Sequence, residues 1–328
     1  MKKLFALFLT VAMMATMLCA CGESNPGTDS GSTSNANTNT DTDTNDEPLE
    51  IAFAHYQQCE FVSLLQDGIE SALEGQNVKL SVLDANYDSA AQLGQVENLI
   101  SQGVDGIILA PCDQNALVPA IEMCKSADMP LVVVNSRLFT EEDYYLVAPN
   151  DIQAGEVEAQ AMMDAIGGKG GVIILECSLG ASWQIERKQG ILNVVETYPD
   201  VEVLAIDCAN GVRDQAMAKM ENFITTYGDK ISGVICENDD MAMGVMSVVQ
   251  SAGLQDSVKI VGVDAIADAL NAVKDGGIIG TVYQDADFEG GEAARKLLQL
   301  IGGEEPDEMQ TFIEMTLVDQ SNVDELLK

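Results

Sequence analysis

Short apolar runs alternate with stretches of helical periodicity along most of this chain. The clearest case is Ile231–Val245, where the β-branched run Ser232–Cys236 ends in four polar residues and apolar residues then recur at helical spacing from Met241. Such a run is typical of a buried parallel strand. Asn238 or Asp239 can cap the helix that follows, because a short side-chain oxygen accepts a bond from an otherwise unpaired backbone N–H. The pattern therefore predicts a strand, a polar turn and a helix, with Asp239 serving only the helix start.

The same alternation extends from Pro48 toward the end of the chain. The first series predicts strands at Ile51–Ala54, Leu80–Leu83, Gly106–Ala110, Leu131–Val134 and Tyr145–Val147, with helices at Val62–Leu73, Ala90–Gln102 and Ala116–Ser126. The second series predicts helices at Ile152–Ile166, Ser182–Glu196, Asp214–Tyr227 and Ala265–Val273, with strands at Val172–Cys177, Glu202–Asp207, Ser232–Cys236, Val258–Val263 and Ile278–Tyr283. A helix at Asp285–Gly302 and a final strand at Phe312–Leu317 complete the pattern.

Repeated β–helix–β units imply parallel sheets with right-handed crossovers, so we predict an α/β protein with two doubly wound, Rossmann-like lobes. We assign residues 49–149 and 285–313 to an N-terminal lobe and residues 150–284 and 314–328 to a C-terminal lobe. Ligands of open α/β sheets bind beyond the carboxyl ends of the strands, so we expect a ligand between the lobes. The turn after Cys236 is then either an ordinary capped turn or part of that site.

The first 48 residues predict export and attachment. Met1–Lys3 is positively charged and Leu4–Ala20 is apolar, which is the layout of an export signal at residues 1–20, with a transmembrane anchor as the alternative. The run ends in Leu-Cys-Ala-Cys, which resembles a bacterial lipobox and predicts cleavage before a lipidated Cys21. Residues 21–48 are almost entirely polar and predict a disordered tether. We therefore expect a lipoprotein exposed at the cell surface or in the periplasm, bound to the membrane only through its lipid.

Charge excludes one class of partner. The 328 residues include 53 acidic and 16 basic ones, which gives a formal net charge of −37. Nucleic-acid binding depends on clustered Lys and Arg that neutralise phosphates, so this class is excluded. A self-repelling, soluble surface is the simplest account of the charge, and we expect a monomer.

The remaining motifs predict neither a cofactor nor a metal. Gly167–Gly171 precedes a strand instead of following one, so it is interpreted as a turn and not as a phosphate-binding loop. The six cysteines after Cys21 show no metal-ligand spacing. The only histidine, His55, ends a strand and is expected to be structural or to line a pocket.

Four polar positions in the second series carry a resemblance to the ribose-type periplasmic sugar-binding proteins of ABC transporters. The segment from Glu237 to Gly244, Glu-Asn-Asp-Asp-Met-Ala-Met-Gly, resembles the family segment whose Asn binds a sugar hydroxyl, and Asn238 is the matching residue. Arg187 matches an Arg-x-x-Gly motif, Asp264 ends a Val-Gly-Val-Asp strand and Gln284 ends Thr-Val-Tyr-Gln. The resemblance covers about Leu49–Gln320 and implies a type I binding-protein fold, with the lobes joined by a multi-strand hinge.

The resemblance also implies further ligand contacts. Phe61, Trp183 and Tyr283 are candidates to cover the C–H face of a sugar ring. In the N-terminal lobe, Asn135-Ser136-Arg137 stands where many members of the family carry Asp-Arg, so Asn135 and Arg137 are candidate contacts. This substitution is similar to the inositol-binding branch and argues against ribose.

We therefore expect an extracytoplasmic, non-enzymatic protein that binds a hexose, an inositol or a similar polyol and delivers it to an ABC transporter permease. A receptor subunit for chemotaxis or for a membrane kinase is the alternative. A repressor's effector domain would need a DNA-reading helix-turn-helix, and an export signal stands in its place. An enzyme is the third candidate, because Glu237, Asp239 and Asp240 could supply paired carboxylates for glycoside hydrolysis.

Overall fold

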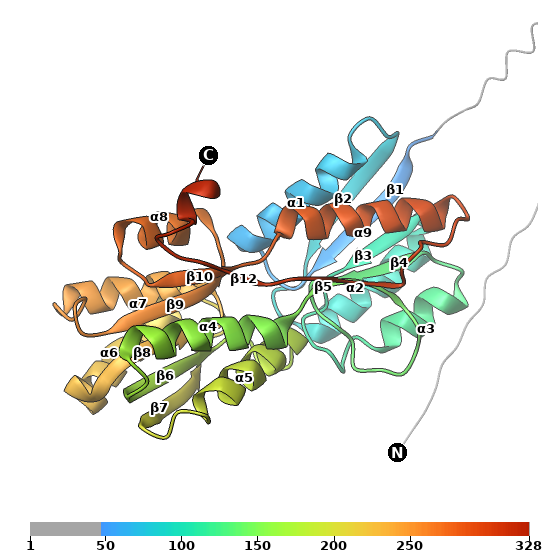
Figure 1. Ribbon diagram of the computed structural model, residues 1–328. Coiled ribbons are helices and arrows are strands. Elements are labelled where there is room, and N and C mark those ends of the chain that lie inside the picture. The colour runs from blue at the N-terminus through green and yellow to red at the C-terminus, as the bar shows by residue number, and fades with distance from the viewer. Residues whose placement is uncertain (1–46, 328) are drawn as a thin grey trace, which may run out of the picture. The chain divides into compact units, whose positions relative to one another are not determined.

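Two six-stranded sheets organise residues 47–327, the part of the chain that the computed structural model describes (Figure 1). The predictions of a signal peptide, a lipidated Cys21 and a tether lie outside these residues, except for the last two tether positions. No helix within the described range is both long enough and apolar enough to cross a bilayer.

The first sheet contains the five strands of the first series and one strand from near the end of the chain. All its strand pairs are parallel. Its strands follow the spatial order β11-β5-β4-β3-β1-β2. They are β1 (Leu49–His55), β2 (Val78–Asp84), β3 (Gly106–Leu109), β4 (Leu131–Val134), β5 (Tyr145–Pro149) and β11 (Gln310–Ile313). The accompanying helices are α1 (Glu60–Leu73), α2 (Ser89–Gln102), α3 (Pro119–Ser126) and α9 (Ala286–Ile301).

The second sheet repeats the same strand order, β12-β10-β9-β8-β6-β7. Its strands are β6 (Gly170–Glu176), β7 (Val201–Cys208), β8 (Ile231–Cys236), β9 (Lys259–Asp264), β10 (Gly280–Tyr283) and β12 (Thr316–Val318), of which only β12 is antiparallel to its neighbour. Its helices are α4 (Asp151–Ile166), α5 (Ser182–Val195), α6 (Arg213–Tyr227), α7 (Asp239–Ser251) and α8 (Ala267–Asp275), with short 3₁₀ turns η1 (Gly228–Lys230) and η2 (Val323–Glu325). The predicted α/β class with two doubly wound lobes is confirmed.

The prediction of a single final strand at Phe312–Leu317 is wrong. The segment divides into β11, which pairs with β5 of the first sheet, and β12, which pairs with β10 of the second. Between them, Met315 is buried, and its backbone N–H donates to the side chain of Gln153 at 3.0 Å. The chain thus leaves one sheet and enters the other within two residues. It makes two other such crossings, from β5 to α4 and from β10 to α9 (Figure 1).

Glycines allow one helix pair in each lobe to pack closely. A Cβ on Gly155 of α4 would overlap the carbonyl oxygen of Arg187 in α5, and a Cβ on Gly190 would overlap that of Ile152. In the other lobe, Gly68 of α1 and Gly290 of α9 lie against the partner helix's backbone in the same way, and Figure 1 shows these helices side by side. The contact between α4 and α5 fixes the position of α5, which carries Arg187.

Candidate ligand-binding site

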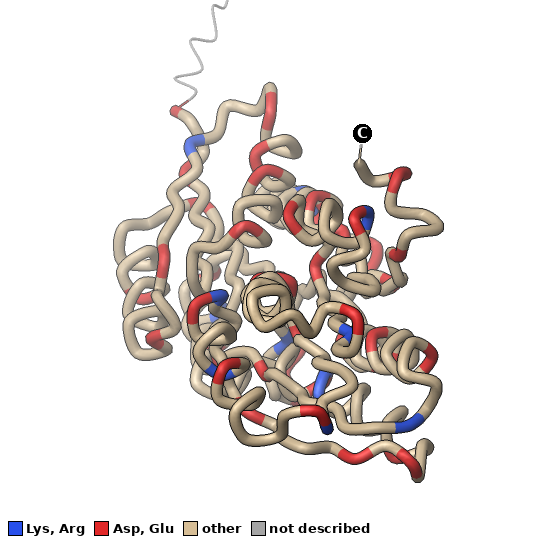
Figure 2. Tube along the Cα trace, turned by 90° about the vertical axis from the view of Figure 1, so that its left-hand side faces the viewer, with Lys and Arg blue, Asp and Glu red and all other residues tan. Residues whose placement is uncertain are grey.

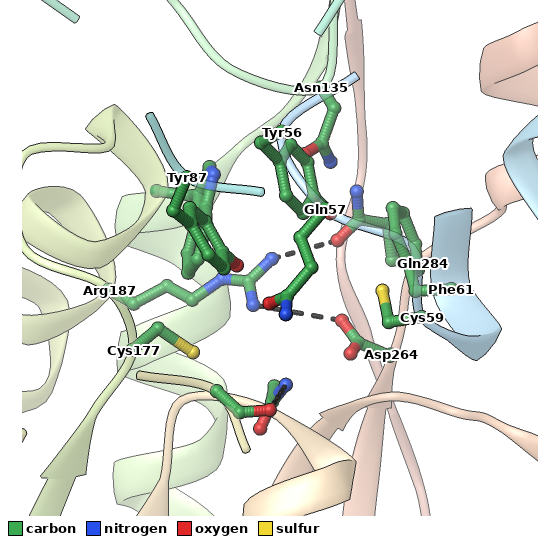
Figure 3. Close-up of a pocket in the computed structure, with 13 residues that line it drawn as sticks. Tyr56, Gln57, Cys59, Phe61, Tyr87, Asn135, Cys177, Arg187, Asp264 and Gln284 are labelled. Atoms are coloured by element: carbon green, nitrogen blue, oxygen red, sulfur yellow. Dashed lines mark hydrogen bonds and ion pairs between the residues drawn. The ribbon is translucent and has the colours of Figure 1, made fainter. Parts of the chain in front are cut away.

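A cavity with an empty volume of about 410 Å³ lies at the carboxyl ends of strands from both sheets. Its lining comes from six residues before Asn150, namely Tyr56, Gln57, Cys59, Phe61, Tyr87 and Asn135, and from seven after it, namely Cys177, Trp183, Arg187, Gly211, Asn238, Asp264 and Gln284 (Figure 3). The wall is therefore shared between the two lobes.

The structure brings together seven of the ten side chains that the sequence nominated as ligand contacts. They are Phe61, Asn135, Trp183, Arg187, Asn238, Asp264 and Gln284. His55 and Arg137 are not among the lining residues. Tyr283, the third aromatic candidate, does not line the cavity either.

His55 does not line the cavity, and its ring packs beside that of Phe53, because alternate residues of a strand share one side. Its ring is buried, with its centroid 5.3 Å from that of Phe53, and burial lowers its pKa although Asp84 acts in the opposite direction. The next residue, Tyr56, lines the cavity instead. His55 is therefore a core residue in this structure.

Arg137 links the lobes beside the cavity. Its guanidinium forms an ion pair with Glu186 of α5 and lies 5.2 Å from the ring centre of Phe312. Its backbone N–H donates to Ser182 Oγ at 2.7 Å. These contacts keep the charged group away from the cavity wall.

Arg187 is the most heavily bonded group of the site. Its Nε donates to Asp151 Oδ1 at 2.9 Å, Nη1 to the carbonyl oxygen of Glu237 at 2.6 Å, and Nη2 to Gln284 Oε1 at 2.8 Å. Nη1 also lies 3.7 Å from Asp264 Oδ1, and Figure 3 shows the guanidinium between Gln284 and Asp264. A planar fork with five donors suits such fixed geometry. The clamp orients Arg187 while leaving N–H groups on both Nη atoms for a ligand.

Asp264 is the one carboxylate among the residues that line the cavity. It ends β9, is 8% exposed, and its only ion pair is the 3.7 Å approach to Arg187. Burial raises its pKa to about 7, although Arg187 acts to lower it. Its φ of 119° is in a region that few residues other than glycine adopt.

Two other lining residues share this unusual backbone. Tyr87 has a φ of 57° and Asn135 a φ of 66°. Backbone strain of this kind concentrates at functional sites, where the surrounding structure maintains it. Three lining side chains thus depend on left-handed backbone for their orientation.

Asn238 combines the two roles that its sequence context allowed. Its Oδ1 accepts from the backbone N–H of Met241 at 3.0 Å and so caps α7. Its Nδ2 donates to the carbonyl oxygen of Gly211 at 3.2 Å, which leaves a second N–H for the cavity. Asn238 is therefore both a helix cap and a lining residue.

The expectation that Asp239 serves only the start of α7 is wrong. Its side chain is fully buried, and Oδ2 accepts from Thr281 Oγ1 at 2.9 Å and from the backbone N–H of Ile266 at 3.1 Å. It therefore ties α7 to β10 and to the loop after β9. It does not line the cavity.

Sequence reasoning missed six lining residues. Tyr56 packs against Tyr87, with ring centres 5.5 Å apart and planes 21° apart, and against Trp183 at 5.9 Å. Burial raises the pKa of Cys59 to about 12 and also raises that of Cys177, so both thiols are neutral. Gln57 and Gly211 complete this group. Cys177 ends a predicted strand and the other five follow one, but this position alone does not distinguish ligand contacts from other residues near strand ends.

The site has no evident capacity for a metal ion. Within residues 47–327, no group of three or more His, Cys, Asp or Glu side chains is arranged to hold one. The wall instead combines one guanidinium, carboxamides, a carboxylate and aromatic rings. These groups donate to and accept from hydroxyls while packing against C–H surfaces.

Two lobes of equal topology around a shared polar cavity define a two-lobed solute-binding protein. The periplasmic binding protein domain family matches residues 51–305, and the chain belongs to this family. The ribose-type resemblance is confirmed, and the family consists of extracytoplasmic, non-enzymatic solute-binding proteins of ABC transporters.

The chain is similar to several other solute-binding proteins along most of its length. It is 38% identical over 280 residues to the xylitol-binding protein of Mycolicibacterium smegmatis, covering 85% of this chain and 80% of the relative. It is 32% identical over 276 residues to a rhizopine-binding protein of Rhizobium meliloti, covering 81% and 88%. A myo-inositol-bound solute-binding protein from Bacillus halodurans superposes with a TM-score of 0.81 at 30% identity, covering 86% of this chain and 99% of that structure.

Proposed function

We propose that this protein captures a neutral sugar or cyclitol outside the cytoplasmic membrane and delivers it to an ABC transporter permease. The observation that carries the proposal is the cavity wall shared by both lobes, in which Arg187 and Asp264 offer a donor and an acceptor side by side. Hydroxyl groups both donate and accept, so a polyol satisfies this pair without adding a charge.

The ligand class follows from the site and from the relatives together. Similar proteins bind xylitol or ribose, and similar structures contain myo-inositol or D-allose. Asn135 replaces a carboxylate acceptor by a carboxamide, which removes one partner for two hydroxyl donors. We therefore infer that a six-carbon ring or a cyclitol is preferred over ribose.

A thermal-shift screen over pentoses, hexoses, inositols and xylitol tests the ligand class, because a ligand that binds only the native state raises the melting temperature. Calorimetry then ranks the positive ligands. A ribose affinity above that of every hexose, inositol and alditol would contradict the inferred preference. Absence of any stabilising polyol would contradict the proposed function.

We infer that binding closes the lobe made of residues 49–149 and 285–313 over the lobe made of residues 150–284 and 314–328. The three crossings of the chain, near residues 150, 285 and 314, act as the hinge, and the permease reads the closed form. Small-angle scattering with and without ligand tests this closure. Uptake of labelled ligand by cells that lack the protein and by complemented cells tests the delivery.

The lipid anchor remains a prediction from residues 18–21. Cys21→Ala should release the protein from the membrane or leave it unprocessed, and mass spectrometry of the native protein should find acyl chains on Cys21. An uncleaved signal in front of an unmodified Cys21 would contradict the anchor. Figure 2 shows acidic residues distributed along the whole described trace, which favours a monomer by mutual repulsion, as light scattering can test.

A further inference from the structure

Trp183 has an unpaired donor in the cavity wall. The residue is in the first turn of α5, is 5% exposed, and lines the cavity. Its Nε1 is buried and has no hydrogen-bond partner among the described residues. Buried indole N–H groups normally have a partner, and a buried donor without one is destabilising.

The ring of Trp183 already has neighbours, whereas its N–H edge lacks a partner. The guanidinium of Arg187 lies 5.7 Å from the ring centre, and the Tyr56 ring packs at 5.9 Å with the planes 46° apart. The aromatic ring of Trp183 is therefore already packed against other groups. The hydrogen bond that the indole N–H can donate in the plane of the ring has no acceptor among the described residues.

Two amide oxygens of the cavity wall already accept other hydrogen bonds. Asn238 Oδ1 accepts the N–H of Met241, and Gln284 Oε1 accepts from Arg187. Arg187 itself offers donors only. None of these three groups pairs with the indole N–H, and a ligand oxygen in the cavity can supply the acceptor.

We propose that the indole N–H of Trp183 donates a hydrogen bond to one oxygen of the ligand, and that Trp183 thereby selects ligands with an oxygen at that position. The inference rests on the proposed function, since it requires a polyol in the cavity. Asp264 accepts from ligand hydroxyls, whereas Trp183 donates to a ligand oxygen. Asp264 and Trp183 together select a ligand that directs one hydroxyl group at each of them. A deoxy analogue that lacks the oxygen near Trp183 leaves the indole N–H unpaired.

Nuclear magnetic resonance tests this bond directly, because Trp183 is the only tryptophan and gives a single indole resonance. Full-length protein labelled with ¹⁵N is titrated with xylitol, myo-inositol and D-allose. With a ligand that calorimetry shows to bind, the indole proton should shift downfield and exchange more slowly with solvent. A bound ligand that leaves both unchanged overturns the inference while preserving the proposed function. If none of the three probes nor any other polyol binds, the proposed function and the inference fail together.

A variant separates the hydrogen bond from packing. Trp183→Phe retains an aromatic ring but lacks the N–H, and should weaken binding of the parent ligand by roughly 5- to 30-fold. The loss should disappear for one monodeoxy analogue of that ligand and persist for the others, because only that analogue lacks the paired oxygen. An equal loss for all analogues indicates a packing role and overturns the inference. The resonance measurement on the unaltered protein decides the matter if the variant does not fold.

Discussion

The carboxylate of Asp239 accepts a hydrogen bond from the hydroxyl of Thr281, 42 residues further along the chain, at 2.9 Å. The same oxygen also accepts the backbone N–H of Ile266 at 3.1 Å. One buried side chain therefore holds three segments at the carboxyl edge of the second sheet, directly behind Asn238 and Asp264.

Replacing Asp239 by Ala should destabilise the protein. The N–H of Ile266 and the hydroxyl of Thr281 would both lose their acceptor, and we expect a loss of about 1–3 kcal/mol in the free energy of unfolding. Urea denaturation measures it. The neighbouring Asp240→Ala is the control, because its partner Arg213 is 40% exposed and surface ion pairs contribute about 0–1 kcal/mol. Equal losses of unfolding free energy in the two variants would contradict the conclusion that Asp239 holds these three segments together.

Above pH 7, where the Asp264 carboxyl is ionised, Asp264→Ala should weaken ligand binding at least about tenfold. Bonds to an ionised acceptor contribute roughly 1.5–3 kcal/mol, and ~1.4 kcal/mol corresponds to a factor of ten. Calorimetry with the preferred polyol checks this. Asp268→Ala, which removes a carboxylate that pairs with Arg213 and does not line the cavity, should retain the affinity. Unchanged binding by the Asp264 variant would contradict the assigned acceptor.

Arg187→Ala should reduce stability as well as binding. It leaves the buried Asp151 without its cationic partner, and removing one member of a buried pair costs about 3–5 kcal/mol. Arg213→Ala is the matched control, because it removes an exposed arginine with two ion pairs and should cost about 1 kcal/mol or less. Urea midpoints for the two variants should differ clearly, and similar midpoints would show that the clamp is dispensable.

Stability of the ligand-free protein should fall as the pH rises from about 4 to about 8. Burial raises the pKa of Asp151 to about 6, of Asp264 to about 7 and of Glu289 to about 8, each above its ordinary value near 4. In that window the folded protein retains protons that the unfolded chain has released, so the free energy of unfolding decreases with pH. Urea midpoints across this range measure the trend.

Asp264→Asn provides the control for the pH dependence. It removes one of the titrating carboxyls, so its stability should fall less steeply between about pH 4 and 7 than that of the unaltered protein. A stability that rises with pH over this window in the unaltered protein would contradict the assignment.

Ser182→Ala should weaken binding of every ligand by a similar factor. Ser182 Oγ accepts the backbone N–H of Arg137 at 2.7 Å and lies 3.2 Å from Ser136 Oγ, so these bonds form only when the lobes meet. Losing them destabilises the closed form, and the apparent affinity falls with its population, by about 3- to 10-fold if one bond of about 1 kcal/mol is lost. Calorimetry with two different polyols checks this, and a loss confined to one of them would indicate direct ligand contact.

Much of the architecture is determined by local sequence. Alternating apolar runs and helical stretches predicted two doubly wound lobes, because a parallel strand buried on both faces needs a continuous apolar run. The position of Asn238 and Asp264 at strand ends followed from the same pattern. The prediction that they contact a ligand came from the family resemblance, since polar residues also follow strands that bind nothing.

Tertiary structure decided which residue of each adjacent pair lines the cavity. His55 and Tyr56 are adjacent, yet only Tyr56 lines the cavity, because the side of a strand that faces the cleft depends on how the second lobe packs against the first. In the same way, Asn238 lines the cavity, whereas its neighbour Asp239 is buried and accepts a hydrogen bond from Thr281. The last strand divides between two sheets because its hydrogen-bond partners, β5 and β10, belong to different lobes. These outcomes depend on contacts between residues far apart in the chain, which no local pattern of apolar and polar residues encodes.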